Sequence, residues 1–167
     1  DSLRENKVMS LKTRFGNLGN ILDFDNLTEE NIYVLDSPIL TNSQFKKFKK
    51  FFSKKIKVID CTFDIQNSLK DRIEAIREEA ETAVREGSTC IVLSDKDFSS
   101  QKASIPSILT VGAVHSHLVK HGLRGYCSLN VECSDAMDTH SFAILIGVGA
   151  TTVNPYLAID SIYQRFE

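Results

Sequence analysis

The chain has 167 residues, of which 42% are hydrophobic and 25% charged, and this composition is typical of one globular domain with a sizeable core. Its 20 basic and 22 acidic residues give a net charge of −2, which predicts neither nucleic-acid binding nor attraction to an anionic membrane surface. The apolar runs are far too short to span a bilayer, and we expect no membrane partner.

The turn-rich stretch "RFGNLGN" marks residues 1–30 as a loop-rich lead-in, and we expect an α/β body over residues 31–167. Apolar spacing and breaker residues predict the elements of this body. In chain order we expect strands at 31–35, 56–64, 89–95, 126–133 and 150–154, and helices at 42–52 (capped by Asn42 or Ser43), 68–86, 107–122, 138–147 and 155–166.

Strand and helix thus alternate about five times, which predicts an α/β domain with a mostly parallel sheet. Right-handed crossovers would place the helices over this sheet or around a segment of a barrel. Five βα units are too few to close an eight-fold barrel.

The stretch "FAILIGVGATTVNPYLAID" (142–160) raises the question of a phosphate-binding loop. A G-x-G-x-x-G motif would need a third glycine at position 152, which is Thr152, and a strand before Gly147. A helix is expected there instead. We therefore interpret Gly147 and Gly149 as a tight turn into the next strand, although backbone amides at such a turn could still bind an anion.

Histidines could serve as metal ligands or bases. His117 and His121 are one turn apart on an expected helix, near His115, but neither a third ligand nor the Glu of an H-E-x-x-H motif accompanies them. We expect surface histidines and no metal. His140 has no nucleophile beside it, so a capping or interface role is the better interpretation.

Polar residues follow two of the expected strands, where ligands bind in parallel α/β sheets. They are Ser94, Asp95 and Asp97 after the first of these strands, and Glu132 and Asp135 after the second. Loops that cap the next segment are the better interpretation of these residues. The lysines of 44–55 oppose a phenylalanine face and are interpreted as solvated.

The four cysteines, Cys61, Cys90, Cys127 and Cys133, form no C-x-x-C pair. Their spacing matches neither a zinc site nor an iron–sulfur motif. We expect buried, reduced thiols in a cytoplasmic protein.

The chain resembles the central domain of the large subunit of glutamate synthase, toward the C-terminal part of that domain. Seven blocks carry the resemblance in one order: "LRENKVMSLKTRFGNLGNIL" (3–22), "SPILT" (37–41), "IDCTFD" (59–64), "IVLSDK" (91–96), "SIPSILTVGAVHSHLVKHGLR" (104–124), "LNVECSDAMDTHSFA" (129–143) and "FAILIGVGATTVNPYLA" (142–158). Ser116 and Ser141 stand where the family pattern has histidines, which weakens a metal role.

The resemblance implies a domain that connects an amidotransferase domain to an FMN-containing synthase domain in one polypeptide. That enzyme converts glutamine and 2-oxoglutarate to two glutamates, using FMN, an iron–sulfur cluster and electrons from NADPH, NADH or ferredoxin, in some cases with a reductase subunit. Ammonia passes between its two active sites through a tunnel. The resemblance also implies that the central domain has the topology of an incomplete TIM barrel.

The residues that the family uses for chemistry are not expected in this segment. The family's glutaminase nucleophile is an N-terminal cysteine, whereas residue 1 is Asp, and the cluster needs three close cysteines, whereas only Cys127 and Cys133 lie near one another. We expect a segment without catalytic, cofactor-binding or metal-binding residues and without activity by itself.

Within this interpretation the loop "TRFGNLGN" is the candidate for the ammonia path, through Thr13, Asn17 and Asn20. A plain domain-packing surface is the alternative. A different class of function also stays open: a free-standing phosphate- or nucleotide-binding module that uses the turn at 147–152 and the loops at 94–97 and 132–138. A catalytic flavin-barrel fragment is a weaker third.

Overall fold

The computed structural model describes residues 3–4, 8–15 and 32–166 and divides the chain into two compact units, Asp1–Pro38 and Ile39–Glu167. In the first unit, β1 (Thr13–Phe15) and β2 (Tyr33–Leu35) form an antiparallel pair with Thr13 opposite Leu35. The second unit contains the α/β architecture.

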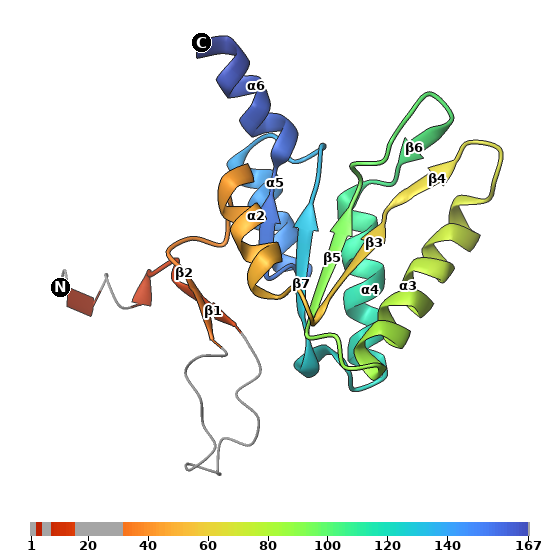
Figure 1. Ribbon diagram of the computed structural model, residues 1–167, viewed down its shortest axis with the longest axis horizontal. Coiled ribbons are helices and arrows are strands. Elements are labelled where there is room, and N and C mark those ends of the chain that lie inside the picture. Colours follow the sequence, from red (N-terminus) through yellow and green to blue (C-terminus); the bar gives the residue numbers. More distant parts are fainter. Residues whose placement is uncertain (1–2, 5–7, 16–31, 167) are drawn as a thin grey trace. The chain divides into compact units, whose positions relative to one another are not determined.

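The second unit is built on a four-stranded parallel sheet with the strand order β3-β5-β7-β8 (Figure 1). Its strands are β3 (Ile56–Asp60), β5 (Cys90–Ser94), β7 (Ser128–Glu132) and β8 (Thr152–Asn154). Its helices are α2 (Asn42–Phe51), α3 (Leu69–Arg85), α4 (Ser107–Lys120), η2 (Arg124–Tyr126), α5 (Thr139–Gly147) and α6 (Tyr156–Phe166). Each strand lies beside the next one along the chain, as in part of an α/β barrel, which confirms the predicted fold class.

Helix α3 shows why these residues fold as they do. Ser68 caps its first turn by accepting a hydrogen bond from the Asp71 amide, and Ile76, Ala80 and Ala83 bury one stripe at helical spacing. This stripe joins the apolar residues of α4, α5 and one face of the sheet in a single core. Figure 1 shows α3 and α4 side by side against that face.

The other face of the sheet carries different side chains because successive residues of a strand point to opposite sides. Leu129 and Val131 of β7 belong to the apolar core, so Ser128, Asn130 and Glu132 point away from it. On this second face, Lys49 of helix α2 reaches Glu132. All three of these polar residues are nevertheless buried.

The structure corrects two boundaries. The expected strand 56–64 breaks at Cys61, and its second part becomes β4 (Thr62–Asp64), which pairs antiparallel with the unpredicted β6 (Lys102–Ser104). The Asp60 carboxylate accepts hydrogen bonds from the amide and hydroxyl of Thr62 and thereby turns the chain. The cap of α2 is Thr41, in a capping box with Gln44, and not Asn42 or Ser43.

Among the described residues, every helix is too short or too polar to pass through a bilayer.

Candidate functional site

The carboxyl ends of the four parallel strands place four polar residues in one row. The register pairs Asp60 with Ser94, Ser94 with Glu132, and Glu132 with Asn154. This edge is where parallel α/β sheets bind ligands. The structure thus brings together Ser94 and Glu132, which the sequence had placed after separate strands.

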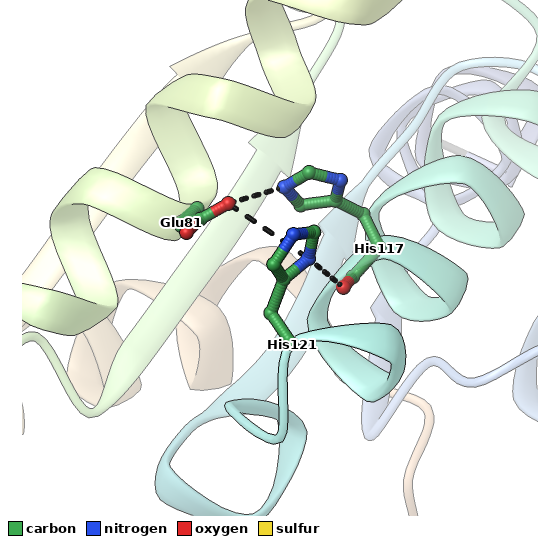
Figure 2. Close-up of side chains that lie close together, drawn as sticks. All are labelled: Glu81, His117 and His121. Carbon is green, nitrogen blue, oxygen red and sulfur yellow. Dashed lines mark hydrogen bonds and ion pairs between the residues drawn. The ribbon is translucent and has the colours of Figure 1, made fainter.

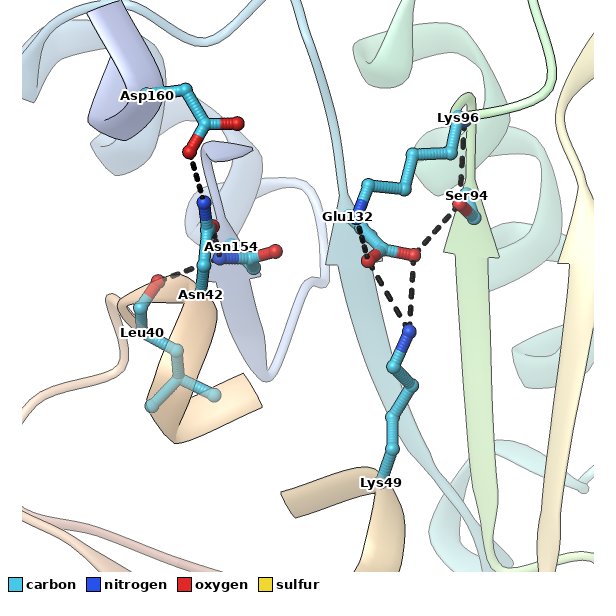
Figure 3. Close-up of polar contacts among 8 residues, drawn as sticks. All are labelled: Leu40, Asn42, Lys49, Ser94, Lys96, Glu132, Asn154 and Asp160. Carbon is cyan, nitrogen blue, oxygen red and sulfur yellow. Dashed lines mark hydrogen bonds and ion pairs between the residues drawn. The ribbon is translucent and has the colours of Figure 1, made fainter. Parts of the chain in front are cut away.

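A buried carboxylate lies at the centre of this row. The Glu132 side chain is 4% exposed, and its oxygens accept hydrogen bonds from the Ser94 hydroxyl at 2.8 Å and from Lys49 of α2 at 3.2 Å (Figure 3). The Lys96 ammonium lies 3.3 Å from the same carboxylate. A buried charge is costly unless it is paired, and here two cations and a hydroxyl pair it. Through Lys49, the carboxylate therefore links α2 to the sheet.

Asn154 forms the second part of this edge. Its amide donates to the Leu40 carbonyl and to the Asn42 side-chain oxygen, both at 2.9 Å, and the Asn42 amide donates to Asp160 of α6 at 2.7 Å (Figure 3). One chain of hydrogen bonds therefore links the start of α2, the end of β8 and helix α6. Sequence patterns contain no signal for it, because more than a hundred residues separate Asn42 from Asn154.

Asp95 extends the edge beyond β5. It is 3% exposed, and one of its oxygens accepts hydrogen bonds from the Ser104 hydroxyl and from both the amide and the hydroxyl of Ser134. Burial, followed by the charge of Asp95, raises the pKa of Tyr156 above its usual value, at which a phenol is already protonated at neutral pH. The Lys96 ammonium lies 5.0 Å from the centre of the Tyr156 ring. Asp95 joins two loops and packs beside a neutral phenol, whereas Asp97 is exposed.

Asp135 and its neighbour Asp138 cap helices. The Asp135 carboxylate accepts hydrogen bonds from the amide and hydroxyl of Ser107 and supplies the side-chain cap that Pro106 does not give α4. Asp138 caps α5 by accepting from the Ser141 amide at 2.7 Å, and this bond holds the pKa of Asp138 below its usual value. His140 is exposed in the first turn of α5. The two aspartates of the loop at 132–138 are thus occupied in capping α4 and α5.

The glycine-rich stretch is a structural turn. The amides of residues 148–151 all donate to backbone carbonyls, those of Ile144, Ile146, Leu145 and Leu129 in turn. Gly149 has φ of +123°, and a Cβ on it would lie 2.3 Å from the His115 ring. Arg124 closes the turn by donating to the Gly149 carbonyl at 2.8 Å. With these amides already paired, the turn does not fit a phosphate group.

The sequence predicted that the histidines of α4 lie on the surface, and for His117 this prediction is wrong. The His117 side chain is 10% exposed and its Nε2 lies 2.6 Å from a carboxylate oxygen of Glu81 on α3 (Figure 2). His121 lies beside them, and one ligand atom of each of the three residues falls within 4.8 Å of the others. Glu81 is the group that sequence reasoning missed, because it precedes His117 by 36 residues.

The cysteines do not fit an iron–sulfur cluster. All four are free thiols in buried positions, and burial raises the pKa values of Cys61, Cys90 and Cys133 to about 12. A cluster needs several thiolates that converge on it, and among the described residues the cysteines form no convergent group of ligands. Neither the thiols nor the amides of the turn therefore suit the iron–sulfur or flavin groups that the resemblance implies for the larger enzyme.

The candidates for an ammonia path lie in the first unit. Thr13 begins β1, and its hydroxyl donates to the Leu11 carbonyl at 3.2 Å. Asn17 and Asn20 lie outside the described residues.

The fold and the edge residues together define a class: an incomplete α/β-barrel-like domain in which Glu132 pairs with Ser94 and with Lys49 of α2, and Asn154 bonds to Asn42. Comparison with known proteins gives the family. The whole chain, residues 1–167, matches the glutamate synthase central domain, and the chain belongs to that family.

The similar proteins come from bacteria, plants and fungi. The chain is 49% identical over 168 residues to the glutamate synthase [NADPH] large chain of Azospirillum brasilense. The matched region covers 99% of this chain and 11% of that protein. It is 38% identical over 170 residues to the chloroplastic ferredoxin-dependent glutamate synthase of Spinacia oleracea (98% and 10%) and 37% identical over 169 residues to the glutamate synthase [NADH] of Schizosaccharomyces pombe (97% and 8%). The chain thus spans about a tenth of the length of these relatives.

Proposed function

We propose that this chain is the connecting domain of a glutamate synthase, the cytoplasmic oxidoreductase that makes two glutamates from glutamine and 2-oxoglutarate. In this proposal the amidotransferase and FMN domains of the same polypeptide flank it, and FMN, the iron–sulfur cluster and the contacts with a reductase subunit belong to other parts of the protein. The segment by itself catalyses neither half-reaction. Its contribution is to fix the distance and orientation of two active sites.

The observation that carries the proposal is the hydrogen-bond chain through Asn42. It ties the segment that enters the α/β body to α6, the helix that leaves it, by bonds of 2.7 and 2.9 Å. Hydrogen bonds are directional, so such a link specifies orientation as well as contact. The paired state of Glu132 and Asp135 supports the same view, since these groups are occupied in holding helices.

The test uses the full-length protein and measures glutamine hydrolysis and glutamate formation separately. Asn42→Ala removes both bonds of the link, and we expect glutamate formed per glutamine hydrolysed to fall while the hydrolysis rate persists. Asp160→Asn is the matched control, because the amide oxygen still accepts from Asn42. An unchanged ratio in Asn42→Ala would contradict the orienting role.

The polar loop is the second part of the proposal. We expect Thr13, Asn17 and Asn20 to line part of the ammonia path, where small polar side chains leave room and offer hydrogen bonds. In the full-length protein, Asn20→Leu should uncouple hydrolysis from glutamate formation. Equal rates of the two, as in the parent protein, would remove Asn20 from the path and leave the loop as a packing surface.

A further inference from the structure

Three metal-ligating side chains converge where α3 packs on α4 (Figure 2). Glu81 lies on α3 and His117 lies on α4. His121, one turn after His117, is the residue that follows α4. The carboxylate oxygen is 2.6 Å from Nε2 of His117, and one ligand atom of each of the three residues lies within 4.8 Å of the others. The side chains are 21%, 10% and 35% exposed, so the cluster is fixed by packing yet open to solvent on one side.

Two of the three ligands are already in a state that can bind a metal. Arg85 holds one carboxylate oxygen of Glu81 at 2.8 Å, and the other oxygen faces Nε2 of His117 at 2.6 Å. The Nδ1 of His121 lies 2.8 Å from the His117 carbonyl. A carbonyl only accepts, so Nδ1 carries the proton and Nε2 of a neutral His121 keeps its lone pair.

The third ligand is held in the opposite tautomer. An Arg77 nitrogen lies 3.3 Å from Nδ1 of His117, and a guanidinium can only donate. The proton of a neutral His117 is therefore on Nε2, directed at Glu81. A metal ion would bind His117 through the lone pair of Nε2. The proton would then be on Nδ1, where it would face the N–H donor of Arg77.

We propose that Glu81, His117 and His121 form a Zn²⁺-type site that joins α3 to α4, with Arg77 as the residue that restrains its occupation. Two imidazoles and one carboxylate are a set that Zn²⁺ accepts, with water in the remaining position. Ligand atoms about 2.0–2.1 Å from tetrahedral zinc lie about 3.3 Å apart. The pair at 2.6 Å therefore has to open by less than an ångström.

Arg77 has an alternative place to go. Its Nε is buried and has no hydrogen-bond partner among the described residues, and its other end pairs with the exposed Glu74 at 3.3 Å. Withdrawal toward Glu74 would release Nδ1 of His117. Replacing Arg77 by glutamine goes further, because a side-chain amide oxygen can accept the Nδ1 proton and so stabilise the metal-binding tautomer.

The experiment is calorimetric titration of the 167-residue chain with ZnSO₄ at pH 7.5, repeated with CoCl₂ and visible absorption to report the coordination. We expect one saturable site in the parent chain and, since an outer partner is worth roughly 10–100-fold in affinity, at least about 10-fold tighter binding in Arg77→Gln. His117→Gln should lose the site. His140→Gln, which removes an exposed histidine elsewhere, should leave it unchanged.

Circular dichroism checks the fold of each variant, and Glu81→Gln replaces His117→Gln if the latter fails to fold. Zinc should also raise the melting temperature of the parent chain and of Arg77→Gln, but not of His117→Gln, because the ion bridges two helices. No saturable binding in both the parent chain and Arg77→Gln would overturn the proposal. Binding that survives His117→Gln and Glu81→Gln would overturn it as well, since the ion would then be elsewhere.

Discussion

The two faces of strand β7 bury their side chains in different ways. Leu129 and Val131 point into an apolar core shared with α3, α4 and α5, whereas Ser128, Asn130 and Glu132 form a polar layer on the opposite side, which Glu132 joins to Lys49 of α2. The apolar contact is non-directional and supplies stability in proportion to buried area. The hydrogen bonds of the polar layer form only at suitable angles and with particular partners. The bond between Glu132 and Lys49 therefore specifies how α2 is oriented on the sheet. The comparison suggests that one face supplies most of the stability and the other most of the geometry.

The largest expected effect separates the two faces at neighbouring positions. Leu129→Ala leaves a cavity at a fully buried site and should reduce the free energy of unfolding by about 2–5 kcal/mol. Asn130→Ala leaves the Ile91 carbonyl and the Thr152 hydroxyl without their bonds to Asn130, which should cost about 1–3 kcal/mol. Urea unfolding of both variants measures the difference. A larger loss in Asn130→Ala would mean that the polar layer is the main source of stability.

The next effect concerns the turn at Gly149. A side chain there meets a φ of +123° and the His115 ring, and the backbone conformation alone costs about 1–3 kcal/mol. Gly149→Ala should therefore melt well below the parent chain. Gly147→Ala is the matched control, since a Cβ at Gly147 meets no atom within 4 Å. Equal melting temperatures for the two variants would show that the turn relaxes around His115.

The smallest effect is a pH dependence at the start of α5. The Ser141 amide and hydroxyl lower the pKa of Asp138 in the folded chain, so this carboxylate stabilises the fold above its unfolded pKa of about 3.9. That contribution is lost as the pH falls through the lower, folded pKa. Asp138→Asn keeps a cap without the titration, and its stability difference from the parent chain should shrink between pH 6 and pH 2. A difference that is constant over this range would contradict the assignment.

Local patterns predicted most of the fold because the apolar face follows simple periods. The five α-helices described in the second unit and the four strands of its parallel sheet appear where spacing placed them, including the α3 stripe through Ile76 and Ala80, whereas the short helix η2 was not predicted. The break at Cys61 was not predictable from spacing, since the residues on both sides favour a strand. It arises when Asp60 binds Thr62 and the chain leaves the sheet.

The candidate site was predicted only in part. Its position at the strand ends follows from parallel topology, which correctly drew attention to Ser94 and Glu132. The partners could not be found, because Lys49 and Asn42 come from a helix that the sequence places far from them. Glu81 was missed for the same reason. Pairing across elements depends on tertiary structure, which a local pattern does not contain.

The most direct test asks whether the polar edge and the turn serve the protein itself or an external ligand. Calorimetric titration of the chain with FMN at neutral pH measures this, because the phosphate of FMN would need the amides of residues 148–151. We predict no saturable heat and no yellow protein, since those amides are already bound to carbonyls. Saturable binding at micromolar FMN would contradict the account and would identify a cofactor-binding domain in place of a connecting one.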